Sequence, residues 1–333
     1  MDDLTRRGFL QGVMGVAALG AGGCVGLPFA GGLRKDETLI ALLSDCHVGN
    51  WKSPTYQGEK MRECIARVLA LDPLPGKMII PGDLAYLWGR KEDYAFSRQL
   101  LQPVLDAGIE LTIGMGNHDR RENFLEFWPE YAARSPVPGR IVSLIRGVHF
   151  DYVMLDTLDE PMETDRWITP GAMDAAQREW LQAHCKAAKR PFLVLAHHPA
   201  GELGEPGEGN TAHSARVFGE LIMGKKESPT LCCGYIHGHD HLWYVTRSLC
   251  HWSDPRIGQT ASLPSTGHWG DIGYSLLREY PDRAELQLVQ YDYFSPNPPR
   301  PDDLPNPAWR AIVRDHEHAR CTFCPVGTCV VEK

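Results

Sequence analysis

The sequence has little positive charge and little cysteine for its length. Its 34 Lys and Arg residues are outnumbered by 42 Asp and Glu residues, which gives a formal net charge of −8. General nucleic-acid binders usually carry a basic face, so we expect no stable nucleic-acid partner. Ten cysteines among 333 residues are too sparse for a small disulfide scaffold. A chain of this length can bury enough surface in one core, and it has no internal repeat and no clear second domain.

The first 35 residues have the order of an export signal. Arg6 and Arg7 precede Phe9 and Leu10, and a Gly/Ala-rich apolar run follows over residues 12–32. A basic region before an apolar one is typical of a secretory signal, and paired arginines are typical of a twin-arginine signal. We therefore predict a signal peptide over 1–35, recognised by the twin-arginine export machinery, and a periplasmic or extracellular protein.

Two other interpretations of this segment stay open. The apolar run is long enough to cross a membrane, but it is rich in Gly and lacks bulky Leu and Ile. We therefore expect no transmembrane segment in the mature protein. Cys24 follows Ala21-Gly22-Gly23, a weak match to a lipoprotein cleavage site, because the bulky residue three positions before the cysteine is missing. Lipid attachment at Cys24 is the lesser alternative.

In the rest of the chain, five short apolar runs each lead into a polar cluster. Such runs predict buried strands, here over residues 39–43, 77–80, 110–113, 192–196 and 230–236. Helical patterns lie between them over 59–71, 94–105, 173–188 and 214–223. This alternation predicts an α/β protein with a parallel or mixed sheet. Later strand patterns, over 242–249, 273–278 and 284–293, indicate a second sheet packed on the first.

The polar clusters contain the side chains of a metal site. Open α/β sheets bind ligands beyond the carboxyl ends of their strands, so the five clusters are expected to converge. Carboxylate, imidazole and amide groups suit metals such as Fe, Mn or Zn. Asp45 and His47 are two residues apart, which directs both side chains the same way, and His239 and His241 repeat that spacing. Tight turns just before the ligands are predicted at Gly82, Gly116 and Gly238.

The five clusters resemble, in this order, the sequence blocks of the calcineurin-like metallophosphoesterases. The blocks are Asp45-x-His47, Gly82-Asp83, Gly116-Asn117-His118-Asp119, His197-His198-Pro199 and Gly238-His239-Asp240-His241, and the match spans residues 39–245. The resemblance implies a four-layer α/β/β/α sandwich of two packed mixed sheets. We expect the catalytic domain over 36–295, followed by a Pro-rich linker and a Cys-containing tail over 296–333.

The same resemblance implies metal-dependent hydrolysis of phosphomonoesters or phosphodiesters. Two divalent or mixed-valence ions (Fe, Mn or Zn) would be bound, the first by Asp45, His47 and His241, the second by Asn117, His197 and His239. Asp83 would bridge both ions, and His198 is the alternate to His197. A hydroxide between the ions would attack phosphorus. His118 would protonate the leaving group or stabilise charge on the phosphate, and Asp119, next in the chain, would orient His118.

The substrate is less constrained than the chemistry. The Asp-x-His block is more similar to bacterial cyclic-nucleotide phosphodiesterase-like members of the family than to purple acid phosphatases. The acidic net charge favours a small soluble ester. Hydrolysis of lipid-derived or nucleotide-sugar phosphoesters at the cell envelope stays open, as does a non-catalytic binding protein with the same fold. Competent residues at all the implied ligand positions favour an enzyme.

Several residues near the blocks have two interpretations. Tyr86 lies where purple acid phosphatases have an iron ligand, but those proteins lack a histidine corresponding to His47, so we expect Tyr86 in the pocket wall or the core. Cys46 and the pair Cys232-Cys233 are expected to pack in the core. The side chains of Arg120 and Arg121 either meet substrate phosphate or are solvated.

Two groups of residues after the last block are also open. The first either lines the substrate pocket or lies in surface loops: His251, Trp252, His268 and Trp269. The second, near the C-terminus, has a spacing that can bind zinc and consists of His316, His318, Cys321, Cys324 and Cys329. In an exported chain we favour disulfides among these cysteines over zinc, and a reduced tail is the third possibility.

Overall fold

The computed structural model describes residues 33–49, 55–159, 171–204, 212–225, 228–246, 260–267, 270–294 and 308–312. The elements described below belong to one compact unit that begins at Arg34. Residues 1–32 of the predicted signal, both groups of residues left open after the last block, and the Pro-rich linker lie outside the described residues. Among the described helices, none is both long and apolar enough to cross a membrane.

The first sheet has the strand order β14-β13-β12-β1-β2-β3. Its strands are β1 (Lys35–Leu42), β2 (Leu74–Ile80), β3 (Glu110–Ile113), β12 (Gly270–Glu279), β13 (Arg283–Phe294) and β14 (Ala308–Ile312). β1, β2 and β3 are parallel, and β12 joins β1 antiparallel. β14 pairs with β13, with Trp309 opposite Leu286. The sheet therefore continues past residue 295, where the sequence placed the end of the catalytic domain.

The second sheet has the strand order β10-β11-β9-β6-β5-β4. Its strands are β4 (Ser143–Arg146), β5 (Asp151–Met154), β6 (Phe192–Ala196), β9 (Cys232–His237), β10 (Tyr244–Thr246) and β11 (Thr260–Ser262). The four inner strands run parallel, and β4 and β10 are antiparallel at the edges. A separate pair, β7 (Gly224–Lys225) and β8 (Ser228–Pro229), is also antiparallel. The sequence did not predict β4, β5 or β11.

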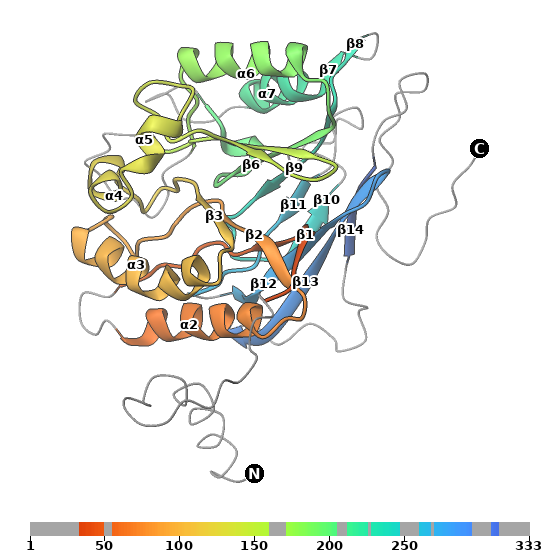
Figure 1. The fold of residues 1–333 in the computed structure, drawn as a ribbon. Helices are drawn as coiled ribbons and strands as arrows, with labels where there is room; N and C mark the ends of the chain where they lie inside the picture. The colour runs from red at the N-terminus through yellow and green to blue at the C-terminus, as the bar shows by residue number, and fades with distance from the viewer. Residues whose placement is uncertain are drawn as a thin grey trace, which may run out of the picture. The chain divides into compact units, whose positions relative to one another are not determined.

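Helices cover the outer face of each sheet, as Figure 1 shows. The first sheet carries α2 (Thr55–Leu69), α3 (Lys91–Asp106), α4 (Arg121–Phe127) and α5 (Glu130–Arg134). The second carries α6 (Ala175–Ala187), the 3-10 turn η2 (Ala200–Glu202) and α7 (Ala212–Met223). The predicted α/β/β/α sandwich of two mixed sheets is therefore confirmed. The predicted division of the strands is wrong, because the patterns over 273–278 and 284–293 form β12 and β13 of the first sheet, whereas β6 and β9 belong to the second.

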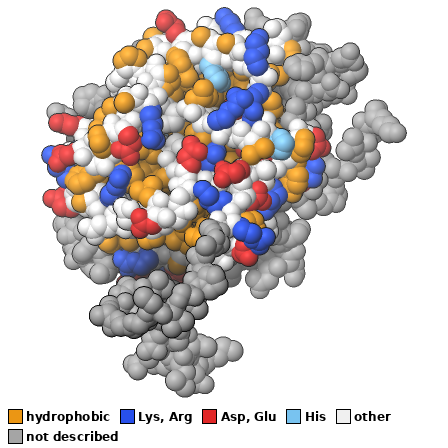
Figure 2. All heavy atoms as spheres, viewed as in Figure 1, with side chains coloured by type: hydrophobic (Ala, Val, Ile, Leu, Met, Phe, Trp, Pro, Cys, Tyr) orange, Lys and Arg blue, Asp and Glu red, His pale blue; other side chains and the backbone are white. Residues whose placement is uncertain are grey.

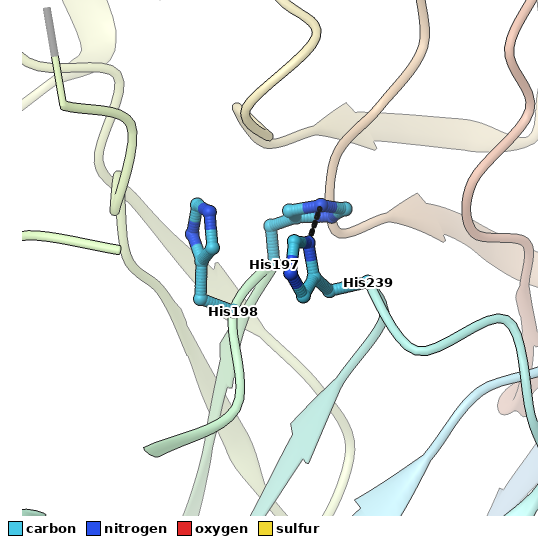
Figure 3. Close-up of side chains that lie close together, drawn as sticks. All are labelled: His197, His198 and His239. Atoms are coloured by element: carbon cyan, nitrogen blue, oxygen red, sulfur yellow. Dashed lines mark hydrogen bonds between the residues drawn. The ribbon is translucent and has the colours of Figure 1, made fainter. Parts of the chain in front are cut away.

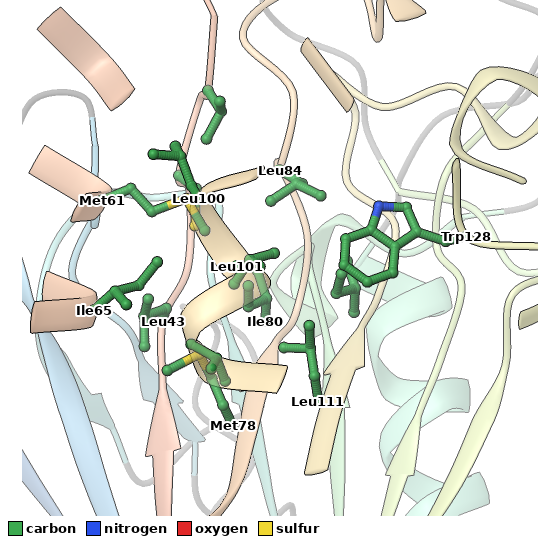
Figure 4. Packing of buried hydrophobic residues seen from close by; sticks show 14 of the residues in the cluster. Leu43, Met61, Ile65, Met78, Ile80, Leu84, Leu100, Leu101, Leu111 and Trp128 are labelled. Atoms are coloured by element: carbon green, nitrogen blue, oxygen red, sulfur yellow. The ribbon is translucent and has the colours of Figure 1, made fainter. Parts of the chain in front are cut away.

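Three buried apolar clusters separate these four layers. The first joins the first sheet to its helices, with Leu43 and Ile80 packed near Leu101 (Figure 4). The second lies between the sheets and includes Ile40 and Leu195. The third packs α6 and α7 against the second sheet. Neighbouring residues of one strand point to opposite faces, and here both faces are buried. The parallel strands therefore read as continuous apolar runs rather than alternating ones.

A buried carboxylate ties the two sheets together at the amino end of β1. Glu279, at the end of β12, is 2% exposed. It accepts hydrogen bonds from the backbone of His149 and Phe150 and, at 2.6 Å, from the hydroxyl of Tyr152. These donors belong to the β4–β5 hairpin of the second sheet. Burial and the neighbouring carboxylate raise the pKa of Tyr152 well above its ordinary value, so its hydroxyl keeps the proton that it donates.

Tyr152→Phe is expected to lower the free energy of unfolding by about 1 to 3 kcal/mol, because it leaves a buried carboxylate oxygen short of a donor. Tyr280→Phe is the matched control, since Tyr280 is partly buried and no hydrogen bond of its hydroxyl is found among the described residues; its effect should stay within about 0.5 kcal/mol. Urea unfolding of the metal-free variants measures both. Equal effects of the two substitutions would contradict a tie through Tyr152.

Candidate metal centre

The predicted ligands come from both sheets and meet at the carboxyl ends of their strands. The first sheet supplies Asp45 and His47 after β1, Asp83 after β2 and Asn117 after β3. The second sheet supplies His197 after β6, and His239 and His241 after β9. All but His239 are at most 5% exposed. The predicted convergence of the five blocks is therefore present in the structure.

The backbone is held in an unfavourable conformation at five of these ligands. Among the described residues other than glycine, positive φ occurs at Asp45 (49°), His47 (43°), Asp83 (50°), His239 (73°) and His241 (56°). Left-handed backbone costs a non-glycine residue on the order of 1–3 kcal/mol, and such strain concentrates at functional sites. The chain therefore turns at the ligands themselves, which directs their side chains into one volume.

The glycines before the ligands have a different role from the predicted one. Gly82, Gly116 and Gly238 do not have positive φ. A Cβ on Gly116 would lie 2.2 Å from Oδ1 of Asp83, and one on Gly238 would lie 2.1 Å from Oγ of Ser44. The prediction of glycine-dependent tight turns is thus corrected. These glycines allow neighbouring strand ends to approach each other closely enough for the ligands to meet.

The first group of ligand atoms belongs to Asp45, His47, Asp83 and His241. Nε2 of His47 lies 3.0 Å from Nε2 of His241, which in turn lies 3.2 Å from Oδ1 of Asp45. Nε2 of His47 is 3.7 Å from Oδ2 of Asp83. All four residues are buried, and their ligand atoms lie within 4.8 Å of one another. This set can hold a metal ion.

The second group consists of Asn117, His197 and His239. Oδ1 of Asn117 lies 3.0 Å from Nε2 of His197 and 3.0 Å from Nδ1 of His239, and the two imidazole nitrogens are 3.2 Å apart. Figure 3 shows the rings of His197 and His239 close together and nearly perpendicular, with the ring of His198 to one side. Nδ1 of His198 lies 2.8 Å from the hydroxyl of Thr157. His198 can still complete a histidine cluster with the other two.

Asp83 connects the two groups. Its Oδ2 is 3.2 Å from Nε2 of His197 as well as 3.7 Å from Nε2 of His47. Bonds of about 2.1 Å to a common ion would place neighbouring ligand atoms about 3.0 to 3.4 Å apart. Most of the separations within the two groups fall in that range. The donor set and its spacing therefore fit metal binding.

The buried carboxylates give the site a strong attraction for cations. Burial alone would raise the pKa of Asp83, but His197, His118 and His47 outweigh burial and hold that pKa well below its ordinary value. For Asp45, burial is likewise outweighed by His241, and the pKa is lowered. Burial opposes protonation of His197, yet the charge of Asp83 raises the pKa of His197 to about 9. Bound protons and metal ions compete for such ligands.

Two carbonyls on one loop fix the histidine tautomers. Nδ1 of His47 lies 3.0 Å from the carbonyl oxygen of Tyr86, and Nδ1 of His118 lies 3.2 Å from that of Leu87. A carbonyl can only accept, so in both rings Nδ1 carries the proton. Nε2 of each ring therefore faces the site, and that of His118 is 3.8 Å from Oδ2 of Asp83. Burial lowers the pKa of His118, although Asp83 opposes this shift.

The role expected of Asp119 is corrected by its contacts. Its buried carboxylate accepts hydrogen bonds from the backbone of Leu84, Ala85 and Gly116 and from the hydroxyl of Tyr94. The carbonyl of Leu87, rather than Asp119, orients the His118 ring. Asp119 instead joins the loops that follow β2 and β3, and those loops carry Asp83 and Asn117. Burial, with a contribution from Asp83, raises the pKa of Asp119 to about 7.

The structure distinguishes the open interpretations of the remaining neighbours. Arg121 is not a solvated charge, because its guanidinium donates to both carboxylate oxygens of the buried Asp156, at 2.6 and 2.7 Å. These bonds hold it within the protein rather than at a substrate. Tyr86 serves the site through its backbone carbonyl. Cys46 packs in the first cluster, as predicted. Cys232 and Cys233 are buried in the third and second clusters, also as predicted.

One acidic residue beside the ligands was not predicted. Oε2 of Glu202, in η2, lies 3.2 Å from Nε2 of His239. Burial opposes ionisation of Glu202, but the hydrogen bond and charge of His239 prevail and lower the pKa of Glu202. No spacing rule relates Glu202 to a ligand 37 positions later, so only the folded chain reveals the pair.

Comparison with known proteins agrees with this geometry. The model of the calcineurin-like phosphoesterase family matches residues 38–242. A probable cyclic nucleotide phosphodiesterase of Rhodopseudomonas palustris is 30% identical over 149 residues, which are 44% of this chain and 50% of that protein. The chain thus spans about half the length of this curated relative. The aligned stretch is also shorter than the stretch from Asp45 to His241, so it does not include the whole ligand set.

The solved structure of PhoD supports the fold. PhoD is similar with a TM-score of 0.53 at 10% identity, covering 88% of this chain and 72% of its own. A Vps29 variant from Entamoeba histolytica has a TM-score of 0.33 at 13% identity, covering 76% of this chain and 92% of its own. At such identity the similarity to PhoD shows a shared fold.

The loop that carries Tyr86 and Leu87 gives a pH-dependent prediction. Asp93 of α3 accepts hydrogen bonds from the backbone of Arg90 and Tyr86, and burial raises its pKa from 3.8 to about 6. The native state therefore binds this proton more tightly than the unfolded chain does. The free energy of unfolding should consequently fall as pH rises between these two values.

Asp93→Asn is expected to remove that fall, which amounts to about 1 to 3 kcal/mol at 1.36 kcal/mol per pKa unit. Urea unfolding of the parent and the variant at about pH 4 and about pH 7 measures how much the free energy of unfolding of each changes with pH. Asp106→Asn, an exposed change on the same helix, is the control and should follow the parent at both pH values. A variant whose stability changes with pH as the parent's does would show that Asp93 does not titrate in this range.

Proposed function

Because the chain belongs to the calcineurin-like phosphoesterase family, and the family together with the phosphodiesterase-named relative indicates a metal-dependent phosphoester hydrolase, we propose that it hydrolyses small phosphoesters with two metal ions. The first ion would be held by Asp45, His47 and His241, and the second by Asn117, His197 and His239. Asp83 would bind both. Iron, manganese and zinc all suit these ligands.

One observation carries the proposal, namely the position of Asp83 between two complete ligand groups. Its Oδ2 approaches a histidine of each group, at 3.2 and 3.7 Å. A carboxylate has lone pairs enough to bind two ions at once. The opposite expectation, a non-catalytic protein with the same fold, is disfavoured because every ligand position and His118 hold chemically competent side chains in contact with one another.

The bound ions and His118 would have separate roles in the hydrolysis. Two ions bound there would supply a clamp on phosphate oxygens and a water acidified to a pKa of about 7. Nε2 of His118 faces the same volume, because its Nδ1 proton is fixed on the Leu87 carbonyl. A second proton taken up on Nε2 can be delivered to the departing oxygen. His118 would therefore serve as the general acid.

A small diester is the first substrate class to test. The relative from Rhodopseudomonas palustris is named a probable cyclic nucleotide phosphodiesterase, and we extend that class to this chain as a proposal. On the face shown in Figure 2, basic and acidic side chains are interspersed. The described residues of this face form no continuous basic track for a long nucleic acid, which supports a small ester.

Paired nitrophenyl esters, one a phosphomonoester and one a phosphodiester, test the proposal. The metal-replete protein is expected to hydrolyse at least one, and the ratio of the two rates reports the preferred class. Asp83→Asn should reduce kcat by about 10³-fold or more, because it removes the ligand shared by both ions. Asp282→Asn, in an exposed turn, should leave kcat unchanged. Absence of hydrolysis by a parent that binds two ions would favour the non-catalytic alternative.

The leaving group tests the role of His118 separately. His118→Ala is expected to lower kcat by about 10²–10⁴-fold for an ester with an alkyl leaving group, which cannot depart without a proton. For a nitrophenyl ester the loss should be much smaller, because nitrophenolate is stable as an anion. Equal losses on both esters would mean that His118 stabilises the phosphate charge instead.

A further inference from the structure

We propose that Glu202 is a positioning residue for the second metal site, which it completes by supplying a negative charge through His239. This inference rests on the proposed function, because it concerns one of the two ions. The carboxylate does not touch the ligand volume directly. It acts on the far side of the His239 ring, where it would fix the tautomer and increase the electron density of the ligand nitrogen.

The ring of His239 has different neighbours at its two nitrogens. Nδ1 lies 3.0 Å from Oδ1 of Asn117 and 3.2 Å from Nε2 of His197, within the second ligand group. Nε2 lies 3.2 Å from Oε2 of Glu202. An ionised carboxylate can only accept, so the proton of the neutral ring is held on Nε2. The lone pair of Nδ1 is therefore directed at the other ligands.

The two metal sites differ in charge without Glu202. The first group contains the carboxylate of Asp45 together with the shared carboxylate of Asp83. The three residues of the second group, Asn117, His197 and His239, are neutral as ligands. Among the proposed ligands, the shared Asp83 is therefore the one negative charge at the second site. Carboxylates behind ligating histidines raise ligand basicity, and their loss typically weakens metal binding about 10- to 100-fold. Glu202 thus compensates for the charge that the second group lacks.

The corresponding contact in the first site is uncharged. Nδ1 of His47 donates to the carbonyl oxygen of Tyr86, at 3.0 Å. A carbonyl fixes the tautomer of the ring as well as a carboxylate does, but it adds no net charge. The ligating histidines of the two sites are therefore held by different groups, a carbonyl in the first and a carboxylate in the second. Removal of Glu202 should weaken metal binding at the second site only.

The segment that carries Glu202 is anchored in the fold. Ala200 and Leu203, on either side of it, are at most 3% exposed and belong to the third apolar cluster. Gly204 donates a backbone hydrogen bond to Gly171 and accepts one from Met173. In η2, the backbone N–H of Glu202 also donates a hydrogen bond to the carbonyl oxygen of Pro199, at 2.9 Å. The Glu202 side chain therefore starts from a fixed backbone beside His239.

Calorimetric titration of the metal-free protein with Mn²⁺ tests this assignment. Two binding events are expected in the parent. In Glu202→Ala one of them should weaken about 10- to 100-fold, while the other changes by less than about twofold. Glu202→Gln, which keeps an acceptor but loses the charge, should fall between parent and alanine variant. Asn117→Ala identifies the second site, because it should abolish the event that Glu202→Ala weakens.

Glu179→Gln and Glu179→Ala are the matched controls, since Glu179 is exposed on α6; both should bind Mn²⁺ as the parent does. Circular dichroism of each metal-free variant checks that it is folded, and the near-isosteric Glu202→Gln carries the test if the alanine variant is not. Unchanged affinity at both sites, or equal weakening of both, would overturn the inference. So would three ions in the parent with one lost in Glu202→Ala, because Glu202 would then be a ligand. A parent that binds fewer than two ions would instead contradict the proposed function itself.

Discussion

A carboxylate buried among imidazoles is the constraint on which this end of the molecule depends. Asp83 is 1% exposed, and an uncompensated charge at such depth would cost several kcal/mol. The fold offsets that cost from several directions. The backbone N–H of His118 donates to Oδ1 at 2.9 Å, and three imidazoles, those of His197, His118 and His47, hold the pKa of Asp83 down. Even the absence of a side chain at Gly116 belongs to this arrangement, because a Cβ there would overlap the carboxylate. The loops after β2 and β3 must therefore approach each other, and their ligands converge as a result.

Much of this arrangement could be predicted from the sequence, and the reason is the parallel sheet. A strand buried on both faces must be apolar along its length, so polar residues that follow it at once mark its carboxyl end. The run ending at Ile80 before Asp83 and the run ending at Ala196 before His197 could be located in this way. Parallel strands of one sheet bring their carboxyl ends to one edge, so the blocks within each sheet could be placed together. The meeting of ligands from two sheets does not follow from this rule, and the sequence did not divide the strands correctly between the sheets. The alternation of strands and helices predicted the fold class for a related reason. Two parallel neighbouring strands must be joined by a crossover connection, which is usually a helix.

The interactions that the sequence did not predict are those made by backbone atoms or by residues outside any periodic pattern. The carbonyl of Leu87 orients His118, and every residue type has a carbonyl, so no letter of the sequence marks it. Asp119 was assigned to His118 because the two are neighbours in the chain, yet its carboxylate turns to the backbone of other loops. Glu202 and Glu279 each act on a segment far away in sequence. The edge strand β14 follows a Pro-rich stretch, and Arg310 interrupts its apolar residues, so no continuous apolar run marks it.

Glu279 and the ligand cluster lie at opposite ends of β1, and both connect the first sheet to the second. At one end the connection is a set of hydrogen bonds from the β4–β5 hairpin to a single carboxylate. At the other, the first sheet presents Asp45, His47, Asp83 and Asn117 to three histidines of the second sheet. Between them the described residues of the two sheets pack in the second apolar cluster, whose contacts resist separation but have no preferred direction. The two sheets are therefore held together by directional polar contacts at two places and by apolar packing between those places. The first of these connections consists of the chain's own hydrogen bonds, whereas a metal ion bound at the second would add bonds to both sheets, so that its binding would also strengthen the contact between them.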